Sequence, residues 1–310
     1  MRAKFRIVER VQGLGPGLAV IVLGLALSLL SDEFLTVSNL LNLLRQVSIN
    51  AIIACGMTLV ILTGGIDLSV GSVLAITGAV MAGLASGGMP WPLALLASLA
   101  LGAALGLFNG VVITRGNVAP FVATLATMAI ARGLTLVYTG GRPITGLPDA
   151  LRSLGTGYVW RIPTPVIVMV LVFVLVHIML VYTPFGRFIY AVGSNEEAAR
   201  FAGIPVARVK LLTYVLTGLA SALAGAILTG RLNSAQPTAG AGFELDAIAA
   251  VVIGGTSLAG GHGSVLGTAV GAVIIGILKN GLNLLNVSSF YQQVAQGVVI
   301  LLAVLMDRRR

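Results

Sequence analysis

The chain has 310 residues, of which 57% are hydrophobic and only 9% are charged, with a mean hydropathy of +1.02 and a net charge of +9. A soluble domain carries about a quarter of its residues as charged side chains, so this composition excludes one. The apolar runs do not alternate as barrel strands do. Helices satisfy their own backbone hydrogen bonds in lipid, so the sequence predicts an all-α polytopic membrane protein.

Apolar runs follow one another along the whole chain. At about 20 residues per span they predict about ten transmembrane helices in a single domain, 1–310. The runs lie at roughly 16–31, 47–64, 70–87, 91–114, 118–138, 165–183, 209–229, 244–259, 264–280 and 290–306.

The basic residues set the expected orientation. Four of them precede the first run and three end the chain: Arg2, Lys4, Arg6, Arg10, Arg308, Arg309 and Arg310. Bases at helix ends mark cytoplasmic flanks, which argues against nucleic-acid binding. We therefore expect a cytoplasmic N-terminal segment 1–15, a cytoplasmic loop 184–208 between spans six and seven, and a cytoplasmic tail 307–310.

The second and third runs are separated by a glycine-rich break, and 64–83 reads GGIDLSVGSVLAITGAVMAG. Asp67 is expected to cap a helix that begins near Leu68. A direct role in transport is the alternative, because ionisable groups at membrane depth are functional candidates. We take Asn50, Asp67, Ser69 and Asn109 as candidate residues of a translocation pathway.

Further polar side chains of the spans fit either a hydrophilic pathway or hydrogen bonds between helices. They are Gln46, Asn50, Asn109, Asn280, Asn283, Gln292, Gln293 and Gln296. Gly102, Gly106 and Gly110 recur at four-residue spacing, as do Gly267 and Gly271. This spacing predicts close helix packing.

The segment SNEEAARFAGIP, at 194–205, is charged and rich in small residues. Ser194 and Glu197 have the spacing of a capping box. Gly203 fits the left-handed position after a helix, Ile204 fits the apolar position after it, and Pro205 forbids continuation. The sequence predicts a short cytoplasmic helix at about 195–202, some 12 Å long.

A second glycine-rich break, at 254–276, reads GGTSLAGGHGSVLGTAVGAVIIG and resembles 64–83. Internal duplication and chance similarity of glycine-rich sequence both explain the likeness. Each region predicts a helix, a break and a new helix. Glu244 and Asp246 fall in the first turn of the eighth predicted helix, where carboxylates favour the positive end of the helix dipole. Asp246 shares with Asp67 the alternative of a transport role.

The sequence lacks the motifs of an ATPase, a metal site and an aspartyl protease. There is no phosphate-binding G-x-x-x-x-G-K-[ST] loop. Two distant histidines, His177 and His262, and the single Cys55 make no metal site at a recognisable spacing. An aspartyl protease built on Asp67 and Asp246 is disfavoured, because neither lies in the sequence context of such enzymes. We expect neither a catalytic residue nor a metal in this chain.

The segment NEEAARFAGI resembles the loop by which permeases of ATP-binding-cassette (ABC) importers couple to their ATPase. From about residue 20 onward the chain resembles the sugar permeases of that class, and within them the ribose permeases. The motifs that carry this likeness are GMTLVILTGGIDLSVGSVLAITGAV (56–80), SAQPTAGAGFELDAIAAVVIGGTSLAGGHGSVLGT (234–268) and NGLNLLNVSSFYQ (280–292).

The resemblance implies a non-enzymatic subunit that moves a monosaccharide, ribose first, across the cell inner membrane by alternating access. Its partners would be a second copy of itself, a cytoplasmic ATPase subunit that binds ATP and Mg, an extracytoplasmic sugar-binding protein and the lipid bilayer. Xylose, galactosides, arabinose and autoinducer-2 remain alternative substrates. The coupling helix would comprise Ser194, Asn195, Glu196, Glu197, Ala198, Ala199, Arg200, Gly203 and Ile204.

An ion-coupled secondary transporter is the competing hypothesis from another class. It would use Asp67 or Asp246 as the coupling carboxylate, and these isolated carboxylates are its sole support.

Overall fold

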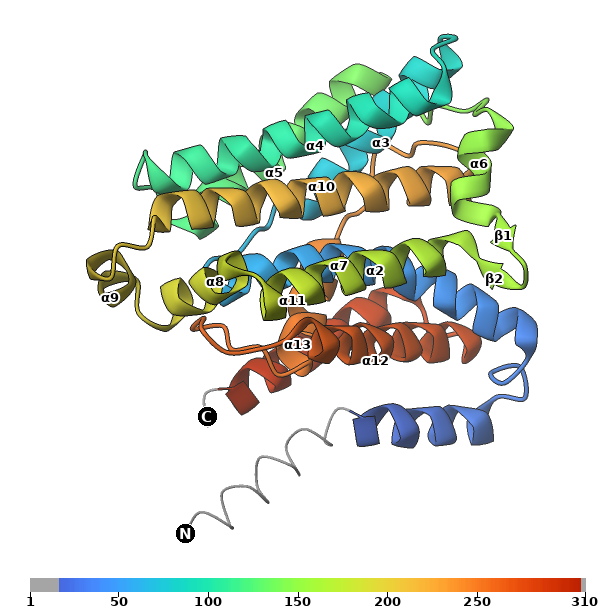
Figure 1. Cartoon of the computed structure of the whole chain (residues 1–310). Coiled ribbons are helices and arrows are strands. Elements are labelled where there is room, and N and C mark those ends of the chain that lie inside the picture. The colour runs from blue at the N-terminus through green and yellow to red at the C-terminus, as the bar shows by residue number, and fades with distance from the viewer. Residues whose placement is uncertain (1–16, 308–310) are drawn as a thin grey trace.

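The computed structural model describes residues 17–307 and is a bundle of helices, most of which run roughly along one axis (Figure 1). The expected cytoplasmic segment 1–15 and the residues 308–310 of the tail lie outside the described residues. A first helix spans Gly17–Leu30. It is followed by α2 (Val37–Leu62), α3 (Val70–Ser86), α4 (Trp91–Thr114), α5 (Pro120–Thr139), α6 (Asp149–Thr156), β1 (Tyr158–Val159), β2 (Ile162–Pro163), α7 (Thr164–Tyr182), α8 (Pro184–Ser194), α9 (Glu196–Phe201), α10 (Val206–Leu232), α11 (Phe243–Ile253), α12 (Val265–Leu284) and α13 (Ser289–Asp307).

Each predicted apolar run holds a helix in the described part of the chain. Six of these helices are long and apolar enough to cross a membrane: α2, α4, α5, α7, α10 and α12. The protein is thus a helical, multi-pass membrane protein. The largest shift of a boundary is at α2, which begins at Val37 rather than near residue 47, because the Thr36 hydroxyl caps it by accepting the N–H of Asn39 at 3.3 Å.

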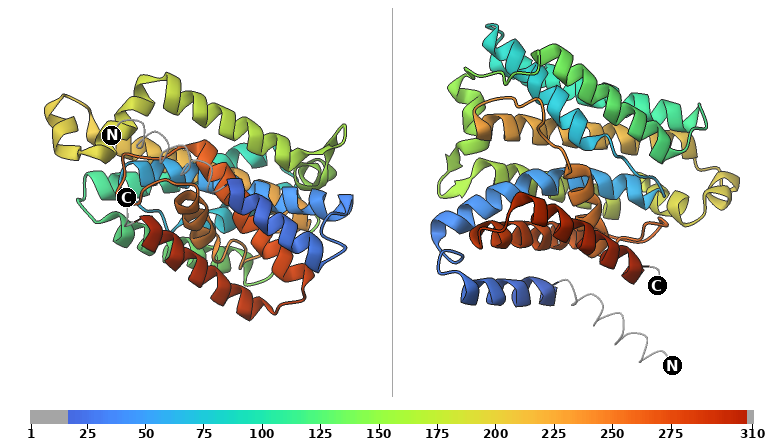
Figure 2. Two further views of the ribbon diagram at one scale, coloured as in Figure 1. Left: turned by 90° about the horizontal axis from the view of Figure 1, so that it is seen from below. Right: turned by 180° about the vertical axis from the view of Figure 1, so that it is seen from behind.

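Five elements lie outside the predicted spans. The helix α6 and the two-residue strands β1 and β2 follow α5, and the strands pair antiparallel with Val159 opposite Ile162. The helices α8 and α9 fill the segment 184–208, which the sequence predicted to hold one short helix. In two views α9 lies at one end of the bundle and α6 with the hairpin at the other (Figures 1 and 2). We call these the α9 end and the α6 end.

The core of the bundle is built on α2 and α10. Most residues of α2 after Leu43 are buried, and α10 packs against α2, α3 and α4. The contact of α4 with α10 is close because glycines face it. A Cβ at Gly102 would lie 2.5 Å from the carbonyl oxygen of Gly218, and one at Gly110 would lie 2.9 Å from Cα of Leu211. The predicted small-residue face of α4 is confirmed as a packing face.

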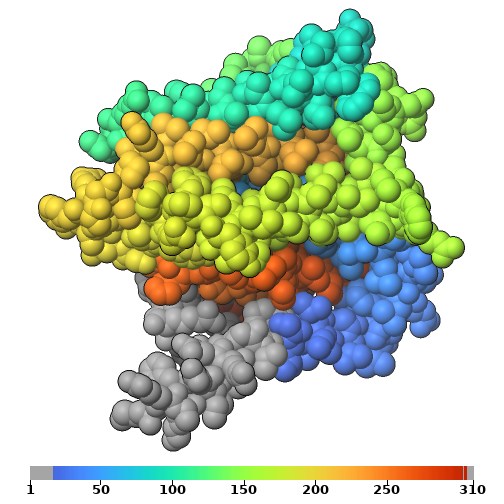
Figure 3. All heavy atoms as spheres, in the orientation of Figure 1, coloured from blue at the N-terminus to red at the C-terminus, as the bar shows by residue number. Residues whose placement is uncertain are grey.

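The helix α7 lies on the outside of the bundle, with large apolar side chains exposed along it. The space-filling view shows a hollow between α7 and α10 (Figure 3). This hollow is an apolar groove of about 320 Å³ lined by residues of α2, α4, α7 and α10. Apolar side chains exposed along a membrane-spanning helix match a lipid-facing surface.

Candidate functional site

The two helices at the α9 end are separated by a single residue. Thr183 caps α8 through a hydrogen bond from the N–H of Gly186 at 3.2 Å, and α8 then continues to Ser194. Asn195 has an extended backbone, and its side-chain oxygen accepts the N–H of Ala198 at 2.8 Å. The cap of α9 is therefore Asn195. The predicted capping box of Ser194 and Glu197 is wrong, because Ser194 belongs to the last turn of α8.

The end of α9 agrees with the prediction. Gly203 has a φ of 82°, in the left-handed region. The N–H of Gly203 donates to the carbonyl of Arg200 at 3.0 Å, and the N–H of Ile204 donates to that of Ala199 at 3.0 Å. These two bonds form a Schellman motif, which closes a helix at a glycine. The helix is six residues long, shorter than the predicted eight, so it measures about 9 Å.

The charges of α9 divide between its two sides. Glu196 accepts hydrogen bonds from Lys210 on α10 at 2.5 Å and from Arg200 at 3.2 Å, which ties α9 to the start of α10. Ala199 is buried against the bundle. Glu197 is exposed, and Phe201 is 91% exposed.

A cleft of about 340 Å³ lies beside α9. Its walls come from the turn between α4 and α5 and from the start of α10, and Glu196, Arg200 and Lys210 line it. The cleft therefore carries two basic side chains and one carboxylate at the α9 end.

Beneath α8, backbones meet at glycines. The N–H of Gly261, in the break 254–264, donates to the carbonyl of Leu62 at the end of α2 at 3.0 Å. A Cβ at Gly193 would overlap that same carbonyl, and one at Gly260 would lie 2.9 Å from the nitrogen of Gly64. The Tyr190 hydroxyl donates to the carbonyl of Gly263 at 2.9 Å, and burial raises the pKa of Tyr190. Both glycine-rich breaks thus contact each other, and the second contacts α8.

Three of the four candidate pathway residues lie together in one buried hydrogen-bond network. The Asp67 carboxylate accepts the N–H of Ser69 at 2.8 Å and its hydroxyl at 2.6 Å. Asn109 on α4 donates to the Ser69 hydroxyl at 2.9 Å and accepts the Thr127 hydroxyl at 2.6 Å. These four side chains are at most 2% exposed. The network therefore joins α3, α4 and α5 inside the bundle.

The expected capping by Asp67 is corrected in detail. The helix α3 begins at Val70, not near Leu68, and Ser69 precedes it without a side-chain cap. Asp67 instead accepts the N–H of Ser69, two residues further on, and so forms a local turn. Short carboxylate side chains make such bonds to nearby backbone groups outside helices.

Asn50 lies in a different network, centred on Asp246. The Asp246 carboxylate accepts from Asn50 of α2 at 3.4 Å and from Gln296 of α13 at 2.7 Å, and it forms an ion pair with Lys279 of α12. Four helices therefore meet at one carboxylate, whose side chain is fully buried. Asp246 lies in the first turn of α11, as predicted, whereas its partner Lys279 was not among the predicted residues. A lone lysine inside the apolar run 265–284 was the signal that pointed to it.

Glu244 is the second carboxylate of the first turn of α11, as expected. It is half-buried and accepts the N–H of Gly242 at 3.3 Å. Arg132 of α5 is also half-buried and donates to the carbonyls of Pro237 at 3.1 Å and Ala239 at 2.8 Å. This arginine, which the sequence analysis did not select, holds the non-helical segment that leads into α11.

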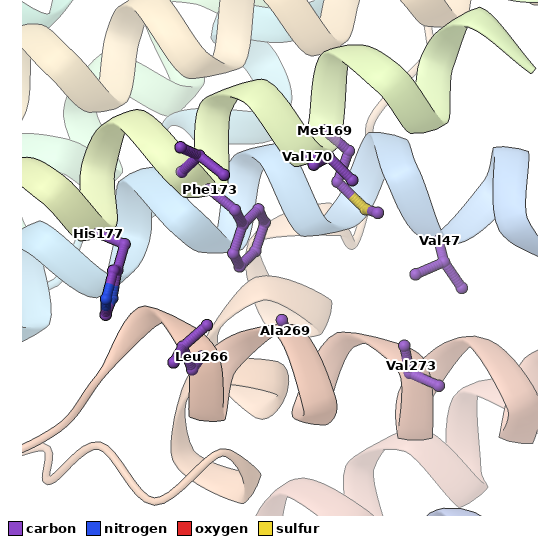
Figure 4. Close-up of a pocket in the computed structure, with 9 residues that line it drawn as sticks. Val47, Met169, Val170, Phe173, His177, Leu266, Ala269 and Val273 are labelled. Atoms are coloured by element: carbon purple, nitrogen blue, oxygen red, sulfur yellow. The ribbon is translucent and has the colours of Figure 1, made fainter.

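An apolar pocket of about 300 Å³ lies between α7, α2 and α12 (Figure 4). Phe173 and Met169 of α7 and Val273 of α12 line it, and His177 stands at one end. Recognition of a sugar requires several convergent polar groups. This pocket has one, so we do not assign it as a sugar site. No cluster of three or more His, Cys, Asp or Glu side chains occurs among residues 17–307.

A bundle of this kind, with polar networks buried at membrane depth and a short capped helix at one end, defines a polytopic membrane transport protein. The family can be stated more closely. A profile of the branched-chain amino acid transport system / permease component family matches residues 39–304, and the chain belongs to that family.

Curated relatives cover nearly the whole chain. It is 58% identical over 302 residues to the ribose import permease protein of Bacillus subtilis, covering 97% of this chain and 94% of that protein. It is 54% identical to the ribose import permease protein of Escherichia coli K12 (94% and 92%). The D-allose transport system permease protein of E. coli K12 is 39% identical (91% and 86%). No solved structure matches the chain.

Proposed function

We propose that this chain is the permease subunit of an ATP-driven ABC importer for ribose. The observation that carries the proposal is the identity of 58% with a ribose import permease over almost the full length of both chains. The D-allose and the xylose transport system permease proteins of E. coli K12 are 39% and 37% identical to this chain, which ranks ribose above those sugars. The chain would transport without catalysing a reaction, and ATP and Mg would bind to a separate ATPase subunit.

The helix α9 would be the contact with that ATPase. Its two ends are fixed by the Asn195 cap and the Gly203 turn. Glu196 anchors it to Lys210, so a force applied to α9 passes directly to α10. The exposed Phe201 and Glu197 supply an apolar and a charged contact for the partner. A short helix with closed ends transmits displacement better than a frayed loop does.

The α9 end would then face the cytoplasm. The last residue of α13 lies toward the same end (Figure 1), which supports a cytoplasmic C-terminus. Ten crossings of the inner membrane would follow if the shorter helices Gly17–Leu30, α3 and α11 count as spans together with α13. The α6 end, with α6 and its hairpin, would face the extracytoplasmic sugar-binding protein.

Alternating access would use the glycine contacts beneath α8. Backbones that meet without side chains slide past each other with few steric barriers. A movement of α8 and α9 driven by the ATPase would therefore reach α2 and the break before α12 through Gly193 and Gly261. A pathway between two copies of the chain would open alternately to each side.

Reconstitution tests the proposal. The chain, its ATPase and its binding protein in liposomes should accumulate ribose only when ATP is hydrolysed. A Glu→Gln substitution of the catalytic carboxylate in the ATPase should abolish uptake. Ribose uptake by the chain alone under a proton or sodium gradient would overturn the proposal in favour of a secondary transporter. Transport of xylose or allose but not ribose would overturn the assignment of the sugar.

A further inference from the structure

Two opposite charges are each partly exposed, Arg132 on α5 and Glu244 on α11. They attract each other electrostatically, yet no ion pair joins them among the described residues. Arg132 is held by the carbonyls of Pro237 and Ala239, at 3.1 and 2.8 Å. Arg132 therefore keeps a fixed position beside the segment that leads into α11.

The Glu244 carboxylate is held in a second way. A Cβ at Gly71 would lie 2.7 Å from its Oε2 atom, so the carboxylate packs against the first turn of α3. The carbonyl oxygen of Gly240 lies closer still to that Cβ, so the backbone contact is what requires a glycine at position 71. The positive end of the α3 dipole favours a negative charge at this place.

Both charges lie near the middle of the membrane. Arg132 is twelve residues from the start of α5, or about 18 Å at 1.5 Å per residue. Glu244 is nine residues from the end of α11, or about 14 Å. Both of those helix ends lie at the α9 end, where Pro120 lines the cleft with Glu196 and the break after α11 contacts α8. The hydrocarbon core is about 30 Å thick, so these depths reach its central part.

Partly exposed charges at this depth do not face lipid, because the cost of a charge at the bilayer centre is at least about 2.5–3.5 kcal/mol per residue. They face a water-filled space or another protein surface. The exposed side chains of α7 give the contrast, since the large ones among them are apolar: Val170, Leu171, Val174, Leu175, Ile178, Val181 and Tyr182. Lipid therefore belongs at the α7 face. Large apolar side chains are exposed along α5 as well, so the two charges alone assign the surface around Arg132 and Glu244 to the transport pathway.

We propose that Glu244 and Arg132 form a sugar-contacting subsite of that pathway, which rests on the proposed function. The carboxylate accepts hydrogen bonds from sugar hydroxyls, and the guanidinium donates to hydroxyl oxygens. The pair has no net charge, which suits an uncharged polyol and disfavours an anionic ligand at the carboxylate. Asp246 is not part of the subsite, because Lys279, Gln296 and Asn50 already occupy it.

Cysteine accessibility tests where the pair faces. The only cysteine of the chain, Cys55, is fully buried, so single introduced cysteines report separately. Glu244→Cys and Arg132→Cys, in the complete transporter in membrane vesicles during ATP turnover, should react with an anionic methanethiosulfonate at least about tenfold faster than Leu175→Cys, because the thiolate forms in water. Leu175 is 66% exposed on α7 and is the lipid-facing control. Added ribose should slow the reaction at 244 and 132. Rates equal to that of the control would overturn the subsite.

Transport measures the contribution of the pair. Glu244→Gln and Arg132→Gln should each lower ribose uptake by about tenfold to a hundredfold, the range expected for a hydrogen bond to a charged group. Co-purification with the ATPase should not change. Glu33→Gln, at an exposed carboxylate before α2, is the matched control and should transport normally.

Normal ribose uptake by Glu244→Gln would refute the subsite. If the unaltered complex fails to transport ribose, the proposed function fails instead, while the cysteine rates still test the location of the pair.

Discussion

The ion pair of Asp246 and Lys279 offers the sharpest test of the interior. The Asp246 side chain is fully buried, and the Lys279 side chain is 25% exposed. Replacing Lys279 by methionine keeps most of the side-chain volume but leaves the carboxylate without its cation. Removal of one partner from a buried ion pair costs about 3–5 kcal/mol. We expect the lower figure, about 3 kcal/mol, because water reaches the lysine.

The expected fall in melting temperature follows from that free energy. The entropy of unfolding is about 2.1 cal/mol/K per residue, so in a chain of 310 residues one kcal/mol shifts Tm by about 1.5 °C, and Lys279→Met should lower Tm by about 5 °C. The double variant Lys279→Met with Asp246→Asn removes both charges, and its amide can still bond with Gln296. It should recover most of the loss, because a neutral pair has no uncompensated charge to bury.

Thermal unfolding of the detergent-solubilised chain, followed by intrinsic fluorescence, measures these shifts. Asp149→Asn is the control, because it breaks an ion pair with Arg152 in which the aspartate is 95% exposed, and exposed pairs contribute little. A Tm for Lys279→Met equal to that of the unaltered protein would show that the ion pair is absent from the folded chain. A double variant less stable than Lys279→Met would show that the cost lies in lost packing rather than charge.

The remaining predictions concern α9 and the glycine contacts. Asn195→Ala should remove the cap of α9 at a cost of about 1 kcal/mol and reduce co-purification with the ATPase, whereas Ser194→Ala should leave it unchanged. Equal effects of the two substitutions would contradict the assigned cap. Gly203→Val should strain the left-handed turn and lower ATP-driven uptake without unfolding the bundle, because no atom lies within 4 Å of the added Cβ and the strain stays in the turn. Gly106→Leu should reduce the yield of folded protein, because even a Cβ at Gly106 would overlap the backbone of Tyr214, and normal yield and Tm would refute that close contact.

The two polar networks explain why the candidate pathway residues separate in space. Asp67, Ser69 and Asn109 belong to a buried cluster whose hydrogen-bonding groups satisfy one another. Asn50 belongs to the cluster of Asp246. A saturated, buried cluster holds helices together more readily than it binds a sugar. The half-exposed Glu244 and Arg132 are better placed to contact one.

Local features of the chain could be predicted because short-range physics decides them. The apolar runs located the helices, since a helix in lipid needs an uninterrupted apolar stretch. The end of α9 was predicted residue by residue, because a left-handed glycine, an apolar residue and a proline act on their own backbone. Its start was missed by one residue. The amphipathic helix α8, which is not a membrane span, was not predicted. Its last residue is Ser194, the serine that was predicted to cap α9.

Only the tertiary structure decided which polar residues meet. Asp246 contacts side chains 33, 50 and 196 positions away in the sequence. Such pairings depend on how the helices are arranged around each other, and hydropathy does not encode that arrangement. The same holds for the glycines, whose spacing predicted close packing but not that Gly193 and Gly261 would bring α8 against the second break. The sequence determined the helices and the family. The packing of the helices decided which carboxylate is buried in an ion pair and which is left to face a ligand.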